Sequence, residues 1–402
     1  MSLALLSLAL TAFAIGMTEF VVVGMLPILA ENFSVSIATA GFLVTAYALA
    51  VMVAAPLVTA ITMRIPRKRL MLGLIGLFIL GNTIAAIAPT YAILLLGRIL
   101  SGVAHGVFFA ISVKVAIQLV EKEKQASAIA LMFSGLTVAL VLGVPLGTFL
   151  AETVTWRSSF WVIVISGILS FLGVQQWIPQ NLHWKIPHSF RQQFSFLRHK
   201  SMLYSYALTI VSFGGPFIAY TYISEILHTV TGFSFNWISV ILVLYGLSVM
   251  AGNYLGGRFS DKFGVFKTLK MNIVLLTVIL LIFYFTQVSS LYSVITIVFW
   301  GALAFGIVPS LQFLIMKLVA HYDVQAEEVA SGTNIAAFNL GIAGGSFVGG
   351  IVVNSGALTA TPLIAAIVVA LSYLLIHTIA KSHECQTSIR EHTNIPKGPT
   401  CQ

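Results

Sequence analysis

The sequence predicts an all-helical protein that crosses a membrane twelve times, with the helices arranged in two similar bundles of six. Of its 402 residues, 58% are hydrophobic and 8% are charged, whereas about 25% of the residues of a typical soluble domain are charged. Long apolar tracts recur along the whole chain, and its two halves match at a fixed offset. This composition excludes a disordered chain, a nucleic-acid binder that relies on charge, and a disulfide-rich secreted domain.

The individual spans are predicted from stretches that contain no Asp, Glu, Lys or Arg, because a crossing helix needs about 20 apolar residues. Stretches long enough for one helix are 32–63, 70–97, 125–151, 158–184, 201–224 and 226–257, and those long enough for two are 70–113 (passing over Arg98), 271–316 and 329–380. Residues 3–30 bring the total to twelve. They are interpreted as a retained helix and not as a signal peptide, because they lack a basic start and contain Glu19 and Pro27.

The distribution of positive charge predicts that both chain termini lie in the cytoplasm. Of the 21 Lys and Arg residues, all but Arg98 and Arg157 fall on the side that this arrangement makes cytoplasmic. The densest group is the loop 64–69, between the second and third spans. An excess of Lys and Arg in the cytoplasmic loops is typical of membrane proteins.

A basic connector divides the chain into two predicted domains. The connector, residues 179–201, contains four Lys and Arg residues and no acid. It separates an amino-terminal six-helix bundle, 1–178, from a carboxyl-terminal six-helix bundle, 202–381. The polar tail 382–402 has few apolar residues and is predicted to be disordered.

The two bundles are related by an offset of 198 residues. At this offset Gly341 and Gly345 fall on Gly143 and Gly147, and one register serves helices two to five and eight to eleven. Transporters with such internal repeats bind their substrate between the halves and open it alternately to each side. A chance match between glycine-rich helices is the alternative explanation.

Three polar side chains inside predicted spans are candidates for proton coupling: Glu19, Arg98 and His105. An intramembrane charge is costly, so each of them requires a partner or a function. Burial of a carboxyl group favours its protonated form and a nearby Arg favours the ionised form, so Glu19 is a candidate proton carrier. The alternatives are an acid that bridges helices, an Arg that binds backbone carbonyls of a neighbouring helix, and a His that hydrogen-bonds across an interface.

Four local motifs make the chain resemble a known family. They are MTEFVVVGMLP at 17–27, GRILSGVAHG at 97–106, GVPLGTFLAETVTWRSSF at 143–160 and GGRFSDKFG at 256–264. The chain resembles the major facilitator superfamily over residues 1–381, and within it the twelve-helix drug:proton antiporter family, near its sugar-efflux, arabinose-exporter-like and purine-efflux members. The resemblance implies a bacterial inner-membrane antiporter that exports a drug, sugar or nucleoside-like solute, with proton coupling through the acid of helix one and the Arg of helix four.

The chain departs from the family pattern at two places. The loop between helices two and three carries Thr59 and Met63 where the family has Gly and Asp, and helix five reads Gly143-Val144-Pro145-Leu146-Gly147 where the family has Gly-Pro followed by Gly-Gly. The family uses the first motif as a cytoplasmic gate latch and the second as a marker of export. We expect the two departures to affect gating and the direction of transport and not the fold.

Two further groups of residues are candidates, one for gating or helix packing and one for the substrate cavity. Gating or helix-packing roles are predicted for Gly143, Pro145, Gly147, Asp261, Gly264, Gly341 and Gly345, because small residues let helices approach closely and Pro bends them. Aromatic and amide residues that could line a substrate cavity are Tyr47, Tyr220, Tyr222, Asn253, Trp300, Gln312, Asn334, Phe338 and Asn339.

Nothing in the sequence indicates an enzyme. It has no phosphate-binding glycine loop with a Lys, no clustered metal ligands and no domain for ATP, so we expect neither a metal nor a cofactor. Cys385 and Cys401 lie in the polar tail, where a structural disulfide is not expected.

The expected partners are a small-molecule substrate, protons and membrane lipid, with no nucleic acid, and the fold can work as a monomer. Facilitated diffusion or proton symport of a sugar or nucleoside is the alternative function, and an intramembrane enzyme or a channel would be a different class.

Overall fold

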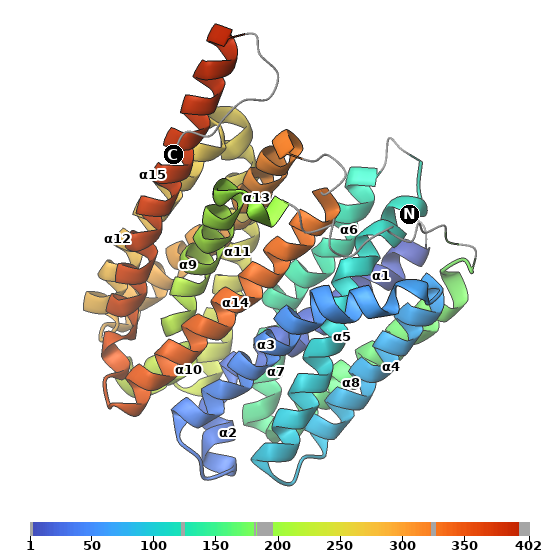
Figure 1. The fold of residues 1–402 in the computed structure, drawn as a ribbon. Coiled ribbons are helices and arrows are strands. Elements are labelled where there is room, and N and C mark those ends of the chain that lie inside the picture. Colours follow the sequence, from blue (N-terminus) through green and yellow to red (C-terminus); the bar gives the residue numbers. More distant parts are fainter. Residues whose placement is uncertain (1–2, 122–124, 181, 183–195, 323–326, 394–402) are drawn as a thin grey trace.

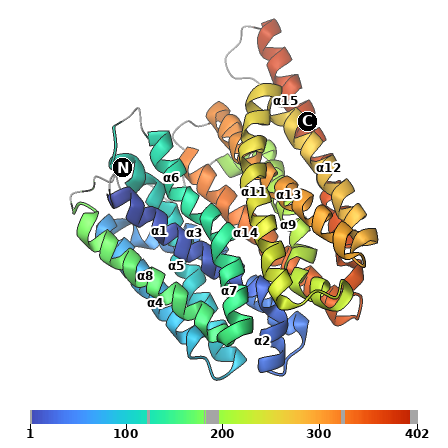
Figure 2. The ribbon, with the colours of Figure 1, turned by 180° about the vertical axis from the view of Figure 1, so that it is seen from behind.

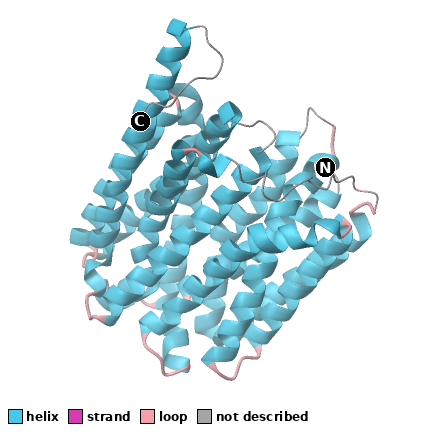
Figure 3. Cartoon of the chain, in the orientation of Figure 1, coloured by secondary structure: helices cyan, strands magenta, loops and turns pink. Residues whose placement is uncertain are grey.

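The computed structural model describes residues 3–121, 125–180, 182, 196–322 and 327–393, and within these ranges almost every residue is helical and none is in a strand (Figure 3). The all-helical fold class is therefore confirmed. Most of the predicted connector and the end of the tail lie outside the described residues.

The first half of the chain, up to residue 178, contains helices α1 to α8. Their bounds are α1 Leu3–Gly24, α2 Leu26–Asn32, α3 Ile37–Ile61, α4 Arg67–Ala86, α5 Tyr91–Gln118, α6 Gln125–Val138, α7 Val144–Leu150 and α8 Trp156–Trp177. A 3-10 turn, Thr62–Arg64, follows α3, and two π-helical turns, Ala139–Gly143 and Ala151–Thr155, flank α7.

The second half contains α9 to α15. Their bounds are α9 Lys200–Tyr220, α10 Ile223–Glu225, α11 Phe235–Phe263, α12 Val265–Thr286, α13 Ser290–Tyr322, α14 Glu327–Asn354 and α15 Thr361–Thr393. A π-helical turn, Ile226–Val230, extends α10, and a 3-10 turn, Leu358–Ala360, precedes α15. Helix α15 continues to Thr393, into the segment 382–402 for which the sequence predicts disorder.

The described residues contain 11 helical stretches that are long and apolar enough to cross a membrane. One of them, Leu131–Trp177, has 47 residues, which is more than twice the length that a crossing needs. It is divided at Thr155, whose backbone is extended, so that α8 returns alongside α7. Counted as two crossings, this stretch gives the twelve that the sequence predicts.

Helices in the two halves pack according to the same plan (Figures 1 and 2). In the first half, α1 packs against α6 and α8, α3 against α5, and α4 against α5 and α8. In the second half, α9 packs against α14 and α15, α11 against α13, and α12 against α13 and α15. These contacts correspond helix by helix. The halves meet along two seams, α3 with α14, and α11 with α7 and the π-helical turn before it.

Both α1 and α9 begin on the side of the bundle where α15 ends, which we call the terminal side; the opposite side is the far side (Figure 1). The sequence predicts one continuous helix over residues 3–30, but the chain breaks at Met25, between α1 and α2. The break follows from Pro27, which has no N–H to donate to the carbonyl of Val23 and cannot continue α1.

Candidate functional site

A cluster of polar side chains is buried in the first half, on α1, α3 and α5. It comprises Glu19 on α1, Tyr47 on α3, and Arg98 and His105 on α5, which are between 1% and 8% exposed. We call these four residues the charged cluster. The structure thus brings together the three residues that the sequence predicts for proton coupling, and adds Tyr47, which the sequence predicts for the substrate cavity.

Arg98 holds α5 against α1 through backbone carbonyls. Its Nη1 donates to the carbonyl oxygen of Thr18, and its Nη2 donates to that of Glu19 at 3.3 Å. The guanidinium carbon lies 4.1 Å from the centre of the Tyr47 ring, which is a cation–π geometry. These contacts match the alternative in which this Arg binds a neighbouring backbone, and they fix α1 at the position of Glu19.

Tyr47 connects Arg98 to His105. Its hydroxyl shares a hydrogen bond of 3.0 Å with Nδ1 of His105. This contact requires α3 and α5 to lie close together, and two glycines of α5 permit it. A Cβ on Gly102 would lie 2.7 Å from the Tyr47 carbonyl oxygen, and one on Gly106 would lie 2.6 Å from that of Val51.

Glu19 differs from its neighbours because its carboxyl group has no direct partner among the described residues. The structure records neither a hydrogen bond nor an ion pair for it there, although Arg98 and Tyr47 lie within electrostatic range. Tyr220, on α9 of the second half, also lies within this range. A carboxyl group in such a position can gain or lose a proton without breaking a hydrogen bond to another described side chain.

Thr18 and Asn82 support α1 from the side of α4. The Thr18 hydroxyl lies 3.2 Å from Asn82 Oδ1, and Asn82 Nδ2 donates to the Phe78 carbonyl at 2.9 Å. This pair was not predicted as a site from the sequence. An amide in an otherwise apolar span was the available signal, because a buried amide needs partners.

The corresponding part of the second half contains aromatic side chains. Tyr220 stacks on Tyr245 with ring centres 4.8 Å apart, and Trp300 meets both rings edge-on. Phe217 and Phe305 join them, and we call these five residues the aromatic cluster. The Trp300 Nε1 atom is buried without a hydrogen-bond partner.

The aromatic cluster contacts α1 next to Glu19. Phe20 lies 6.5 Å from Phe217 and 6.4 Å from Phe305, measured between ring centres. Tyr220 and Trp300 were predicted as cavity residues, but Tyr245 was missed. The sequence did contain a signal for Tyr245, because this residue falls on Tyr47 at the offset of 198 residues.

A chain of polar side chains links three helices of the second half. Thr209 on α9 donates to Asn334 Oδ1 on α14 at 2.8 Å, and Asn334 Nδ2 donates to Gln312 Oε1 on α13 at 2.8 Å. Asn334 and Gln312 were both predicted as cavity residues. The structure places them in one network, separate from the charged cluster.

The other predicted cavity residues lie apart from one another. The Tyr222 hydroxyl donates to the Ser346 carbonyl at 3.1 Å, at the far end of the seam between α3 and α14. Phe338 packs edge-on against Phe213, 4.9 Å between ring centres. Asn339 is 4% exposed and donates to its own helix, and its Oδ1 is unpaired. Asn253, half-buried on α11, has no recorded hydrogen bond in the described part of the chain.

The glycines predicted to pack helices lie at close contacts. A Cβ on Gly143 would lie 2.3 Å from Met17 Cγ of α1, and one on Gly147 would lie 2.2 Å from Val21 Cγ2 of the same helix. A Cβ on Gly341 would lie 2.6 Å from the Ile210 carbonyl oxygen, and one on Gly345 would lie 2.1 Å from that of Gly214. Pro145 is the second residue of α7, which directly follows a π-helical turn.

Gly264 and Asp261 lie at the terminal end of α11. Gly264 ends α11 with a φ of 81°, a conformation that favours glycine, and a Cβ there would contact nothing within 4 Å. Its predicted packing role is therefore replaced by a turn. The side chain of Asp261 lies outside the described residues.

The two halves are joined at the far side next to the charged cluster. The Ser224 hydroxyl on α10 donates to the Val23 carbonyl of α1 at 2.7 Å. This carbonyl would bond to residue 27 in a continuous helix, but residue 27 is Pro. Ser224 therefore supplies the missing donor from the other half.

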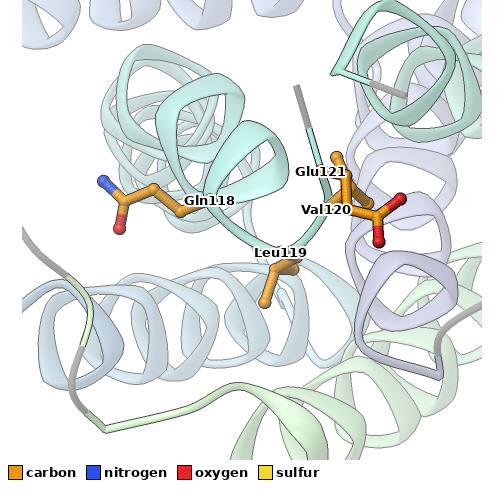
Figure 4. Close-up of a pocket in the computed structure, with 4 residues that line it drawn as sticks. All are labelled: Gln118, Leu119, Val120 and Glu121. Carbon is orange, nitrogen blue, oxygen red and sulfur yellow. The ribbon is translucent and has the colours of Figure 1, made fainter. Parts of the chain in front are cut away.

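Two cavities lie away from these clusters. One, of about 480 Å³, is at the terminal end of α5 and is lined by Gln118, Leu119, Val120 and Glu121 (Figure 4). The other, of about 270 Å³, lies between α3 and α14 near the far side. In the ranges that the structure describes, no three His, Cys, Asp or Glu residues lie close enough to hold a metal ion.

Comparisons with known proteins agree on one family. Residues 8–326 match the Major Facilitator Superfamily. The chain is 40% identical over 366 residues to the MFS-type transporter YtbD of Bacillus subtilis (strain 168), covering 91% of this chain and 92% of that protein. It is 39% identical over 378 residues to the inner membrane transport protein YdhP of Escherichia coli (strain K12), covering 94% and 96%. The crystal structure of a D-xylose-proton symporter has the same fold, with a TM-score of 0.75 at 15% identity, covering 92% of this chain and 96% of that one.

Proposed function

Because the chain belongs to the Major Facilitator Superfamily of membrane transporters, we propose that it is a proton-coupled antiporter that exports a small organic solute. Membership of this family makes it a multi-pass membrane transporter of small solutes and not an enzyme. Proton coupling, export and cytoplasmic termini are the proposed parts. The export direction rests on the resemblance of the chain to drug:proton antiporters, from which helix five departs at the family's export motif.

The observation that carries the proposal is the position of Glu19. Its carboxyl group is buried on α1 without a direct partner among the described residues, and the aromatic cluster of the other half begins beside it at Phe20. A buried carboxyl group is more stable protonated than ionised unless a cation neutralises it. Movement of α1 relative to the second half would change its surroundings and therefore its affinity for a proton.

The charged cluster gives each neighbour of Glu19 a role in the proposed cycle. Arg98 is a positioning residue, because its donors hold the carbonyls of Thr18 and Glu19 itself. Tyr47 keeps the guanidinium in place and bonds to His105. Glu19 takes a proton from the outer face, the halves rock inward, and solute capture favours release of that proton to the cytoplasm.

The hydrogen bond between Ser224 and Val23 and the contacts of Phe20 with Phe217 and Phe305 join the halves on the far side. In the proposed orientation the far side faces outward, so the structure corresponds to a state that is closed to the outside at this point. Opening there would separate α1 from α9, α10 and α13. It would thereby expose Glu19 to water on the outer face.

A second candidate is proton symport or facilitated diffusion of a neutral sugar or nucleoside. The network of Thr209, Asn334 and Gln312 favours it, because one hydroxyl and two amide groups on three helices of the second half can exchange hydrogen bonds with the hydroxyl groups of such a solute. This candidate uses the same alternating halves. Symport would move the solute in the same direction as the protons, whereas facilitated diffusion would not respond to the proton gradient.

Transport into phospholipid vesicles separates the two candidates. A transported solute is first identified by thermal stabilisation of the detergent-solubilised protein against ethidium, chloramphenicol, arabinose and inosine, since a ligand that prefers the folded state raises its stability. The purified protein is then reconstituted, a pH gradient is imposed, and flux of that solute is followed together with a pH-sensitive dye in the lumen. Antiport predicts solute movement opposite to the protons.

Glu19→Gln should abolish gradient-driven flux while exchange of labelled for unlabelled solute continues. The matched control is Glu31→Gln, which changes an exposed acid of α2 and should retain full gradient-driven flux. Gradient-driven flux that persists in Glu19→Gln contradicts the role of Glu19. Wild-type flux that ignores the gradient contradicts proton coupling and supports facilitated diffusion.

A further inference from the structure

A groove on the outside of the seam between α3 and α14 has no part in the proposed cycle. Its cavity volume is about 270 Å³, just below the range of about 300–1,000 Å³ that is typical of small-molecule sites. Three apolar side chains at its edge, Phe42 of α3 and Phe347 and Ile351 of α14, are 39%, 53% and 58% exposed. On helices that cross a membrane, such side chains contact lipid, so the groove opens to the bilayer.

The floor of this groove carries an unpaired polar group. Thr45 is 3% exposed, and its hydroxyl has no hydrogen-bond partner. The other hydroxyls at the floor are occupied, because that of Ser346 bonds to Thr221 at 2.7 Å and that of Tyr222 donates to the Ser346 carbonyl. A buried hydroxyl without a partner costs free energy that a bound molecule with a hydrogen-bonding group can recover.

The walls of the groove belong to different halves of the chain, and Tyr222 closes it toward the interior. Two glycines make room for the Tyr222 ring: a Cβ on Gly41 of α3 would lie 2.2 Å from its hydroxyl oxygen, and one on Gly350 of α14 would lie 2.8 Å from it. The groove therefore opens toward the lipid, and no residue of the charged cluster is among those that line it. A molecule in it would touch both halves.

We propose that this groove binds one small neutral amphipathic molecule that enters from the membrane. Its hydroxyl or carbonyl group bonds to the Thr45 hydroxyl, and its apolar part lies between Phe42 and Phe347. A neutral ligand is indicated because none of the residues described as lining the groove is an acid or a base. The volume suits a molecule of the size of a medium-chain alcohol and not a complete phospholipid.

The probe is a photoactivatable octanol that carries a diazirine, added to the full-length protein in phosphatidylcholine vesicles, with labelled peptides identified by mass spectrometry. Labelling should concentrate on α3 and α14. Ile351→Trp, which fills the edge of the groove, should reduce this labelling at least fivefold. Ile367→Trp is the matched control, because Ile367 is similarly exposed, 53%, on α15, and it should leave the labelling unchanged.

Thr45→Val tests the hydrogen bond with a side chain of the same shape. Unlabelled 1-octanol should displace the probe from wild type at a concentration about 2- to 10-fold lower than from Thr45→Val, as expected for one neutral hydrogen bond. Thermal unfolding of each variant verifies that it is folded.

Three outcomes would overturn the proposal. They are even labelling of all lipid-facing helices, labelling of α3 and α14 that Ile351→Trp leaves unchanged, and equal displacement in wild type and Thr45→Val. Native mass spectrometry that shows a phospholipid lost specifically in Ile351→Trp would also overturn it, because the occupant would then be a bilayer lipid. None of these outcomes depends on proton coupling or on the direction of transport.

Discussion

Tyr47 in the first half and Tyr245 in the second fall on each other at the offset of 198 residues, yet their surroundings differ in chemistry. Tyr47 lies between Arg98 and His105, whereas Tyr245 lies between Tyr220 and Trp300. The helices around both tyrosines pack by the same plan.

The same offset places Phe217 opposite Glu19, Thr296 opposite Arg98 and Leu303 opposite His105. The second half therefore has no counterpart of the charged cluster at these positions. In the proposed cycle the two halves move as equivalent rigid bodies, proton binding belongs to the first half, and aromatic contact with the solute belongs to the second. Relative motion of the halves would then couple the two processes.

The largest expected effect is the difference in gradient-driven flux between variants of Arg98 and variants of its counterpart Thr296. Arg98→Ala removes two charge-assisted hydrogen bonds to α1, each worth about 1.5–3 kcal/mol, so gradient-driven flux in vesicles should fall about 100-fold. Arg98→Lys should recover only part of this flux, because an ammonium group cannot reproduce the planar guanidinium contacts. Thr296→Ala should stay within about twofold of wild type, since its hydroxyl bonds to carbonyls of its own helix and otherwise meets the Thr286 hydroxyl of α12 only at 3.4 Å. Equal effects of Arg98→Ala and Thr296→Ala would refute the division between the halves.

The glycine seams should differ in how much they tolerate a methyl group. In Gly345→Ala the Cβ meets the backbone of Gly214, which a side-chain rotation cannot relieve, so the free energy of unfolding should fall by about 1–3 kcal/mol or more. Gly147→Ala clashes with the Val21 side chain and reaches Ser159 Cβ only at an ordinary contact distance of 3.7 Å, so it should cost less. Gly344→Ala, with nothing within 4 Å of the new Cβ, is the control and should not destabilise the protein. Thermal unfolding in detergent ranks the three, and any other order contradicts the packing described here.

Removing the hydroxyl group of Tyr47 or of Tyr245 should affect gradient-driven flux to different extents. Tyr47→Phe loses the hydrogen bond to His105 but keeps the ring over Arg98, so gradient-driven flux should fall about 2- to 10-fold. Tyr245→Phe should change it less than twofold, because no hydrogen bond of the Tyr245 hydroxyl is recorded among the described residues. A larger loss of gradient-driven flux in Tyr245→Phe than in Tyr47→Phe would contradict the assignment of proton coupling to the first half.

The smallest expected effect concerns the contact that joins the halves at the far side. Ser224→Ala removes the donor to the Val23 carbonyl and should increase the population that is open there about 2- to 10-fold. Pulsed electron paramagnetic resonance between labels at Glu31→Cys and Val288→Cys, with Cys385 and Cys401 replaced by Ser, measures this population. Ser239→Ala is the control, because the Ser239 hydroxyl bonds within α11. An unchanged distance distribution in Ser224→Ala would show that this contact does not hold the far side closed.

Most of the fold follows from the sequence because lipid permits only a few backbone solutions. Apolar tracts of helical length must become helices, and charged or Pro- and Gly-containing breaks mark their ends. The break at Met25 was the exception. Residues 26–30 continue the apolar stretch of the helix before them, and the missing N–H of Pro27 separates α2 from α1.

The site could be predicted only in part. Glu19, Arg98 and His105 are visible because polar groups are rare in apolar spans. Tyr222 was predicted to line a central substrate cavity with the other aromatic and amide residues, but it lies at the far end of the seam between α3 and α14. Its position could not be predicted because the sequence of a helix that is apolar on all sides does not reveal which face points inward. Ser224 could not be predicted, since its partner Val23 is 201 residues away in the chain.

The protonation of Glu19 itself provides the most direct test of the account. Infrared difference spectra of the reconstituted protein, recorded through a pH titration and compared with those of Glu19→Gln, isolate the carbonyl band of this one carboxylic acid. We predict a protonated-carboxyl band that appears and disappears with pH in wild type, is missing in Glu19→Gln and shifts when the transported solute binds. A Glu19 carboxylate that stays ionised at every pH at which the protein transports would contradict proton coupling at this residue.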